Sequence, residues 1–200
     1  MTFIVTETSI PKKISDTIIE VNTDTIKILI NDLNILGNAI FFPKSDILTE
    51  ERIFIPPNKF GVLKIPDIND DTIIYTTDNG KILGISVPPS GLKLINEIQK
   101  DRIFNNITIE NLEEKLQLFV GLNLVKSISF NIQKNGWDLE IVNKTSNKNN
   151  QNLYNQYPCP ISSAAIILIT RVLNEKIRIY NTIHNGYKIK YHLNLIKKKS

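Results

Sequence analysis

The sequence predicts an α+β protein in which an N-terminal all-β domain, a small sandwich or barrel, precedes an α+β domain. Three observations predict this. Short β-branched segments separated by turn residues fill residues 1–88. Asn-Gly dipeptides separate alternating apolar segments at three places. An apolar helical pattern stands between the last two of these hairpins, within residues 89–200. The length of 200 residues allows one large domain or two small ones.

The first region consists of short segments that have the period of strands. Strands are expected at residues 2–6, 18–22, 26–30, 33–42, 52–55, 60–65, 73–77 and 81–87. Asn79-Gly80 separates the last two segments and favours the positive φ angles of a type I′ turn, so these two are predicted to form a hairpin. Pro88 and Pro89 end the region.

The second region begins with two predicted helices, one from Leu92 and one from Thr108 that ends at Gly121 in a left-handed conformation. Two hairpins are then expected around Asn-Gly turns, at residues 124–133 with 137–143 and at residues 177–183 with 187–195. Residues 144–156 are polar and lack periodicity, which is typical of a mobile loop. The hairpins would form a four-stranded antiparallel sheet in the order ββαββ, with the helices packed on one face.

The helix expected over residues 160–174 is the centre of this second domain. Pro160 suits its first position, where the missing N–H would have no partner, and either Cys159 or Ser162 could act as the N-cap. Apolar residues occupy nearly every side of this helix, which is typical of a helix buried between layers. The apolar run ends at Arg171, short of the roughly 20 residues that a membrane span needs.

The C-terminal region also resembles a known family. The resembling features are Cys159-Pro160, Ala164-Ala165, Glu175-Lys176-Ile177, Asn185-Gly186 and the alternating residues 187–195. Residues 124–195 resemble the end of the 4-vinyl-reductase-like domains, which are relatives of vesicle-tethering (TRAPP) subunits. The resemblance implies an α+β module that senses small molecules or contacts proteins. Those domains often carry further cysteines where this chain has Ser162, Ser163, Thr182 and His184, so the resemblance implies no metal- or thiol-based site here.

The composition of the chain excludes some classes of site and limits the classes of function that we expect. Lys and Arg number 24 and Asp and Glu number 20, so the net charge is only +4, and a C-terminal lysine run supplies most of the excess. A single cysteine excludes an intrachain disulfide and a cysteine-based structural zinc site. The N-terminus lacks the pattern of a signal peptide. We therefore expect a soluble, cytoplasmic protein with no transmembrane segment and no cofactor.

Few residues have the pattern of a catalytic or metal site. Cys159 at a helix start could be a nucleophile with His184 or His192 as its base, but no oxyanion loop or third member is visible. The spacing of these three residues matches no zinc pattern. Asp67, Asp70 and Asp71 resemble a calcium loop that lacks its glycine and closing glutamate, so a solvated turn is expected.

The leading hypothesis is therefore a non-catalytic ligand-binding or protein-interaction module, which would hold an apolar small molecule or a protein partner and could form a homodimer. The candidate binding residues are Tyr157, Cys159, Ser162, Trp137, Tyr187 and Tyr191. Trp137 is expected to lie in the core. A nucleic-acid-binding protein is one alternative, because aromatic residues alternate with lysines at residues 187–191, although the low net charge argues against it. A cysteine-dependent enzyme using Cys159 is the second alternative.

Overall fold

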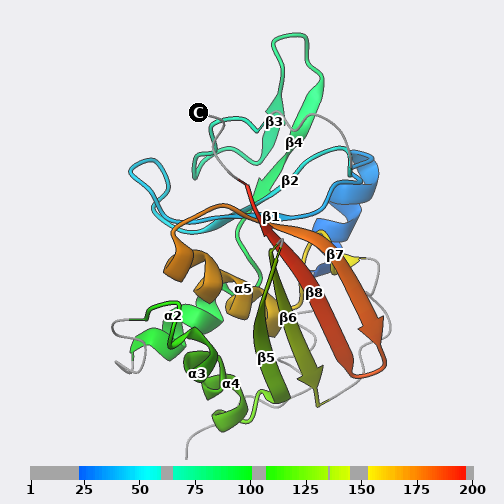
Figure 1. The fold of residues 1–200 in the computed structure, drawn as a ribbon. Coiled ribbons are helices and arrows are strands. Elements are labelled where there is room, and N and C mark those ends of the chain that lie inside the picture. The colour runs from blue at the N-terminus through cyan, green and yellow to red at the C-terminus, as the bar shows by residue number, and fades with distance from the viewer. Residues whose placement is uncertain (1–22, 60–64, 101–106, 135, 145–152, 197–200) are drawn as a thin grey trace, which may run out of the picture.

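The described residues form one antiparallel sheet of eight strands in the order β3-β4-β2-β1-β7-β8-β6-β5. The structure is a computed structural model that describes residues 23–59, 65–100, 107–134, 136–144 and 153–196. The sheet curves around one central helix (Figure 1). Its strands are β1 (Ile40–Phe42), β2 (Arg52–Ile55), β3 (Ile74–Thr76), β4 (Ile82–Val87), β5 (Val125–Gln133), β6 (Gly136–Asn143), β7 (Ile177–Asn185) and β8 (Lys188–Leu195).

Helices cover the concave face of this sheet. They are α2 (Leu92–Lys100), α3 (Leu112–Leu116), α4 (Leu118–Gly121) and α5 (Pro160–Leu173). Residues 23–32 are also helical. Apolar side chains from all of these helices and from both halves of the sheet form one main core. The fold is therefore mixed α+β, as the sequence predicts.

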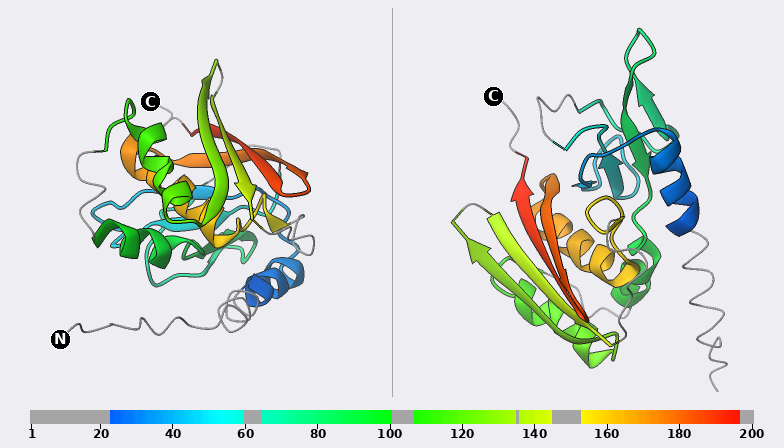
Figure 2. Two further views of the ribbon diagram at one scale, coloured as in Figure 1. Left: turned by 90° about the horizontal axis from the view of Figure 1, so that it is seen from below. Right: turned by 90° about the vertical axis from the view of Figure 1, so that its right-hand side faces the viewer.

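Helix α5 is the buried centre of the molecule, which confirms the prediction for residues 160–174. Every residue from Ser162 to Thr170 is buried. Pro160 occupies the first turn, and Cys159 stands at the N-cap position without a capping side-chain hydrogen bond. Asn174 ends the helix in the left-handed conformation with φ 50°. In the right-hand view of Figure 2, α5 lies in the middle of the molecule with the long strands β5 to β8 on one side.

The predicted separate N-terminal sandwich or barrel is wrong, because its strands extend the C-terminal sheet. Strand β1 pairs with β7 through Ile40↔Arg178 and Phe41↔Ile177. All three residues of β1 are buried, which requires a strand in the interior of a sheet with cover on both faces. The predicted ββαββ sequence of β5, β6, α5, β7 and β8 is present, but it forms one half of a larger sheet.

The strand predicted at residues 26–30 is also wrong, since residues 23–32 are helical. Its alternating isoleucines gave the strand period, yet Ile28 is 60% exposed. The residues that meet the core are Ile26, Leu29, Ile30 and Leu33, which have helical spacing. Gly121 lies within α4, and the left-handed residue that follows is Asn123, with φ 62°. The strands predicted at residues 2–6 and 18–22, and most of the one at 60–65 and of the loop at 144–156, lie outside the described residues.

The hairpin predictions are confirmed, because β3 pairs with β4, β5 with β6 and β7 with β8. A second, smaller core lies on the other face of the N-terminal strands and includes Phe42, Phe54 and Tyr75. Their rings meet edge to face at centroid distances of 6.4 and 6.1 Å. No helix among the described residues has the length and apolar character that crossing a membrane requires.

Candidate functional site

An apolar cleft lies where the helical residues 23–32, the turn from β4 to α2 and the start of α5 meet. We call it the proline cleft, because three prolines line it. Its volume is about 460 Å³. The lining residues are Thr23, Thr25, Ile26, Glu50, Pro88, Pro89, Ser90, Leu92, Lys93, Asn96, Tyr157 and Pro160. Segments from the first, second and last thirds of the chain thus build one concave surface.

Two hydrogen bonds join the proline turns that form the walls of this cleft. The Ser90 hydroxyl donates to the carbonyl of Pro158 at 2.6 Å. The Tyr157 hydroxyl donates to the carbonyl of Pro88 at 3.2 Å. Proline fixes φ, so a turn that contains it has little conformational freedom. The walls of the proline cleft are therefore tied together, and these hydroxyls have partners within the protein.

The back of the cleft is closed by a tight approach of α2 to α5. Gly91 precedes α2, and a Cβ atom there would lie 2.2 Å from the backbone nitrogen of Ala164 and 2.3 Å from the carbonyl oxygen of Pro160. Both atoms belong to the backbone of α5 and cannot move without shifting the helix. Glycine at this position lets the two helices meet, which brings Leu92 and Pro160 into the same lining.

The cleft combines an apolar floor with a polar rim. Pro89, Leu92 and Tyr157 are buried, and Ile26 is half-buried. Burial raises the pKa of Tyr157 to about 12, so its hydroxyl stays neutral at physiological pH. Glu50 and Lys93 add opposite charges to the rim. Among the described residues, the lining includes no cysteine and no histidine, and it combines apolar surface with a few polar groups, which is typical of a small-molecule site.

Three residues predicted from the sequence, Cys159, Ser162 and Tyr191, meet beside this cleft. The Cys159 sulfur lies 3.2 Å from the Ser162 hydroxyl oxygen. Burial raises the pKa of Tyr191 well above its usual value and nearby Cys159 adds to the rise, whereas the Ser162 hydroxyl opposes it. Burial, with a contribution from Cys159, also raises the pKa of the neighbouring Tyr154 to about 12. The start of α5 therefore carries a buried cluster of neutral hydroxyl groups.

The histidines do not join Cys159 in a catalytic arrangement. His184 is half-buried, with its ring 5.8 Å from that of Tyr154. Burial lowers the pKa of His184. His192 alternates with the buried Tyr191 and instead contacts Asp138. In the described ranges, no hydrogen bond links Cys159 to either histidine, and no group of three or more metal-ligating side chains occurs.

Trp137 and Tyr187 lie apart from the proline cleft. Trp137 is partly buried and packs against the main core, as the sequence predicts. Tyr187 is 50% exposed, and the Lys126 ammonium lies 4.8 Å from its ring centroid. Lys188 and Lys190 form ion pairs with Glu140 at 2.7 Å and Asp138 at 2.9 Å. These carboxylates neutralise the cations that suggested nucleic-acid binding.

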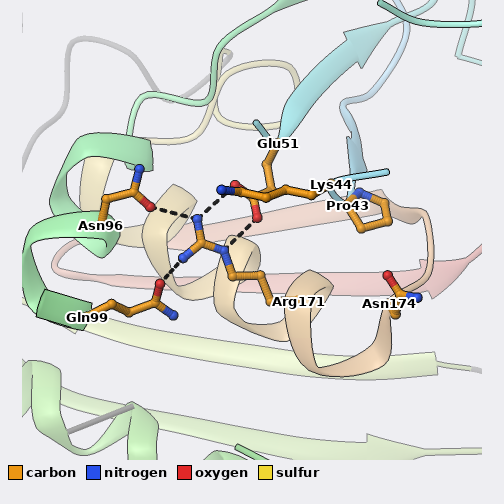
Figure 3. Close-up of a pocket in the computed structure, with 7 residues that line it drawn as sticks. All are labelled: Pro43, Lys44, Glu51, Asn96, Gln99, Arg171 and Asn174. Atoms are coloured by element: carbon orange, nitrogen blue, oxygen red, sulfur yellow. Dashed lines mark hydrogen bonds and ion pairs between the residues drawn. The ribbon is translucent and has the colours of Figure 1, made fainter. Parts of the chain in front are cut away.

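The structure also reveals a buried ion pair at the far end of α5 (Figure 3). Arg171 Nε and Nη2 donate to the two carboxylate oxygens of Glu51 at 2.6 and 2.8 Å. Arg171 also donates to Asn96, at 2.7 Å, and to Gln99. Glu51 has a side-chain exposure of only 1%, although a charged residue such as glutamate is expected to face solvent.

A pocket of about 310 Å³ opens beside Arg171, between the connection from β1 to β2, helix α2 and the end of α5. The guanidinium donates to acceptors from two segments, the residue before β2 and helix α2, so it holds both of them to α5. Arg171 was visible in the sequence as the end of an apolar run. Nothing in the sequence connects it to Glu51, which lies 120 residues away along the chain.

Comparisons with known proteins give no further guide to this site, because no family model, no curated protein and no solved structure matches the chain.

Proposed function

We propose that the protein is a non-catalytic binding module that holds a small apolar molecule in the proline cleft. The observation that carries the proposal is the composition of the lining. Ile26, Pro89 and Leu92 offer apolar surface, while the hydroxyls of Ser90 and Tyr157 already donate to backbone carbonyls. An apolar ligand would therefore cover apolar surface without leaving those hydroxyls unpaired.

The size of the cleft favours a small molecule over a macromolecular partner. Its volume of about 460 Å³ falls within the range of roughly 300–1,000 Å³ typical of small-molecule sites. The bonded proline turns preform the walls, which lowers the entropy cost of binding. The resemblance of residues 124–195 to 4-vinyl-reductase-like domains supports the same class of function, since small-molecule sensing is one role of those domains.

A homodimer through an apolar sheet surface is not part of this proposal. The exposed face of β6 and β8 carries the ion pairs Lys188–Glu140 and Lys190–Asp138. Exposed apolar side chains do occur on the neighbouring strands, at Ile132 of β5 and Ile183 of β7, and a homodimer through this sheet stays a prediction.

Fluorescence of N-phenyl-1-naphthylamine, an uncharged apolar dye, tests the proposal. We expect saturable enhancement with the wild-type protein. Ile26→Asp places a charge in the apolar floor and should weaken dye binding at least about tenfold, because burying an unpaired carboxylate is costly. The matched control is Ile28→Asp, which changes the same helical segment at a position that is 60% exposed and outside the cleft.

Thermal unfolding of both variants shows whether each remains folded, and Ile26→Trp, which fills the cleft with apolar volume, gives a second block that introduces no charge. Absence of saturable enhancement with the wild-type protein would overturn the proposal. Equal binding by wild type, Ile26→Trp and Ile28→Asp would place the dye elsewhere and would also overturn it.

A further inference from the structure

A second hollow lies on the face of β6, β7 and β8 that is turned away from α5. Its volume is about 680 Å³. The lining residues are Gln133, Gly136, Trp137, Asp138, Tyr180, Asn181, His192 and Asn194. None of them lines the proline cleft. We call this the outer hollow. Its lining has three carboxamides, a carboxylate and an imidazole, which sets it apart from the apolar cleft described above.

A hydrogen-bonded pair of side chains, Asp138 and His192, forms one wall of the outer hollow. Asp138 and His192 are cross-strand partners, and His192 Nδ1 lies 2.5 Å from Asp138 Oδ1. Lys190 Nζ contacts the second carboxylate oxygen at 2.9 Å, and Asp138 is only 7% exposed. Desolvation would raise the pKa of Asp138, but the hydrogen bonds from Lys190 and His192, together with the nearby positive charge, outweigh it, so the pKa is lowered. Asp138 is therefore a carboxylate that accepts from both neighbours.

The hydrogen bond to Asp138 determines how the His192 ring can hydrogen-bond to a ligand. A carboxylate only accepts hydrogen bonds, so Nδ1 of His192 carries the proton that points to Asp138. In the neutral imidazole, Nε2 is then an acceptor with a fixed direction. No hydrogen bond to Nε2 occurs within the described part of the chain. A hydroxyl group of a ligand could donate to this nitrogen.

A β-bulge shapes the opposite wall. The register of β7 with β8 shifts between Ile179 and Asn181, so Tyr180 is the extra residue of the bulge. The side-chain amide of Asn38, which is 7% exposed, donates to the carbonyl of Tyr180 at 2.7 Å. Tyr180 itself is 59% exposed. The bulge is thus anchored from another part of the fold, and it leaves an aromatic ring uncovered at the hollow.

The floor is shaped by a close approach at Gly136. A Cβ atom there would lie 2.3 Å from both Asn194 Oδ1 and the carbonyl oxygen of Leu193, and φ is +149°. Only glycine lets the β5–β6 turn meet β8 this closely. The approach brings Gln133 and Asn194 into one lining with Asp138 and His192.

We propose that the outer hollow is a second binding site, for a neutral, hydroxyl-bearing small molecule such as a sugar unit. Lys190 balances the charge of Asp138, so the site has no excess charge to select an ion. The carboxamides of Gln133 and Asn181 can both donate and accept, which matches hydroxyl groups. His192 Nε2 accepts from one hydroxyl. The Tyr180 ring packs against the apolar C–H face of the ligand.

Titration of the ¹⁵N-labelled full chain with individual neutral monosaccharides tests this inference by two-dimensional NMR. We expect at least one sugar to shift the amide resonances of Asp138, Tyr180 and His192 in a saturable manner. Tyr180→Ala should weaken that binding about tenfold or more, through loss of the packing ring. The matched control is Tyr187→Ala, which removes a similarly exposed tyrosine at the far end of the same hairpin and should leave binding unchanged.

Asp138→Asn provides a second, nearly isosteric variant. It removes the carboxylate that orients His192 and should also weaken sugar binding, while dye binding in the proline cleft stays unchanged. Conversely, Ile26→Asp should leave sugar binding intact, so failure of either site is distinguishable from failure of the other. Saturable shifts with inorganic phosphate alone, no shift with any neutral sugar, or equal losses in Tyr180→Ala and Tyr187→Ala would each overturn the inference.

Discussion

The hydroxyl of Tyr191 shows how burial changes the contribution of one polar atom to the stability of the fold. Tyr191 is fully buried between the sheet and the start of α5, and its hydroxyl makes no hydrogen bond of standard geometry to the described residues. Tyr75 is similarly buried, yet its hydroxyl accepts from the backbone N–H of Asn69 at 2.9 Å. An unpaired buried hydroxyl destabilises a fold, whereas a paired one contributes modestly.

We therefore expect opposite effects from the same substitution at these two tyrosines. Tyr191→Phe should raise the free energy of unfolding by up to about 1 kcal/mol, because it keeps the ring and removes a buried polar atom whose contact with Ser162 lacks the geometry of a full hydrogen bond. Tyr75→Phe should lower it by about 1 kcal/mol, because it breaks the bond to Asn69. Urea titrations of wild type and both variants measure the difference. A loss of stability in Tyr191→Phe as large as that in Tyr75→Phe would contradict the expectation.

Single residues of the binding regions were only partly predictable. Tyr157 and Cys159 stand next to the prolines that start α5, so local sequence signals identified them. The pair formed by Asp138 and His192 was missed for a physical reason. Strand alternation puts His192 and Tyr191 on opposite faces of β8, but β6 and β8 are not joined by a turn, so no local signal sets the register that pairs Asp138 with His192.

At the scale of elements, the contact between α2 and α5 depends on one residue without a side chain. A Cβ atom at Gly91 would meet backbone atoms of α5, whereas at Gly121 in α4 nothing lies within 4 Å. The two glycines therefore have different roles: one allows a helix contact, and the other only lowers helix propensity.

Gly91→Ala should lower the free energy of unfolding by about 2–3 kcal/mol, because overpacking against an immobile backbone forces the helices apart. Gly121→Ala should leave stability unchanged or raise it by up to about 1 kcal/mol, as expected for alanine in a helix. Thermal and chemical unfolding measure both values. If the two variants were equally stable, the close approach of α2 to α5 would be refuted.

Elements fixed by local rules were predictable, and those fixed by distant packing were not. The Asn-Gly turns specify the three hairpins, and the apolar run specifies α5. The helical residues 23–32 were misjudged because Ile26, Ile28 and Ile30 fit the strand period while Ile26, Leu29 and Ile30 fit the helical one. The choice between the two periods is made by contact with the core.

At the scale of the whole molecule, the ion pair between Arg171 and Glu51 joins the C-terminal half of the chain to its N-terminal half. Glu51 precedes β2, Arg171 stands in the last turn of α5, and Asn96 and Gln99 of α2 complete the cluster. A charge with 1% exposure is tolerated only while its partner is present. The cluster thus makes the placement of α5 depend on the N-terminal strands.

Arg171→Met should lower the free energy of unfolding by about 3–5 kcal/mol, because Glu51 would remain buried without a counter-charge. Replacing both residues by methionine should recover much of that loss, since two apolar side chains can occupy a similar space. The control is Lys100→Met, which breaks the exposed pair Lys100–Glu97 and should cost less than about 0.5 kcal/mol. A double variant no more stable than Arg171→Met would contradict the pairing.

The short seam between β1 and β7 has a consequence for synthesis of the chain. Strand β1 leaves the ribosome long before β7, and β7 is the neighbour that covers its second edge. Until β7 has been synthesised, β1 in the nascent chain would expose an unpaired, apolar strand edge. Completion of the native topology must therefore wait for translation of the hairpin formed by β7 and β8, which makes the earlier strands of this fold dependent on a segment made much later.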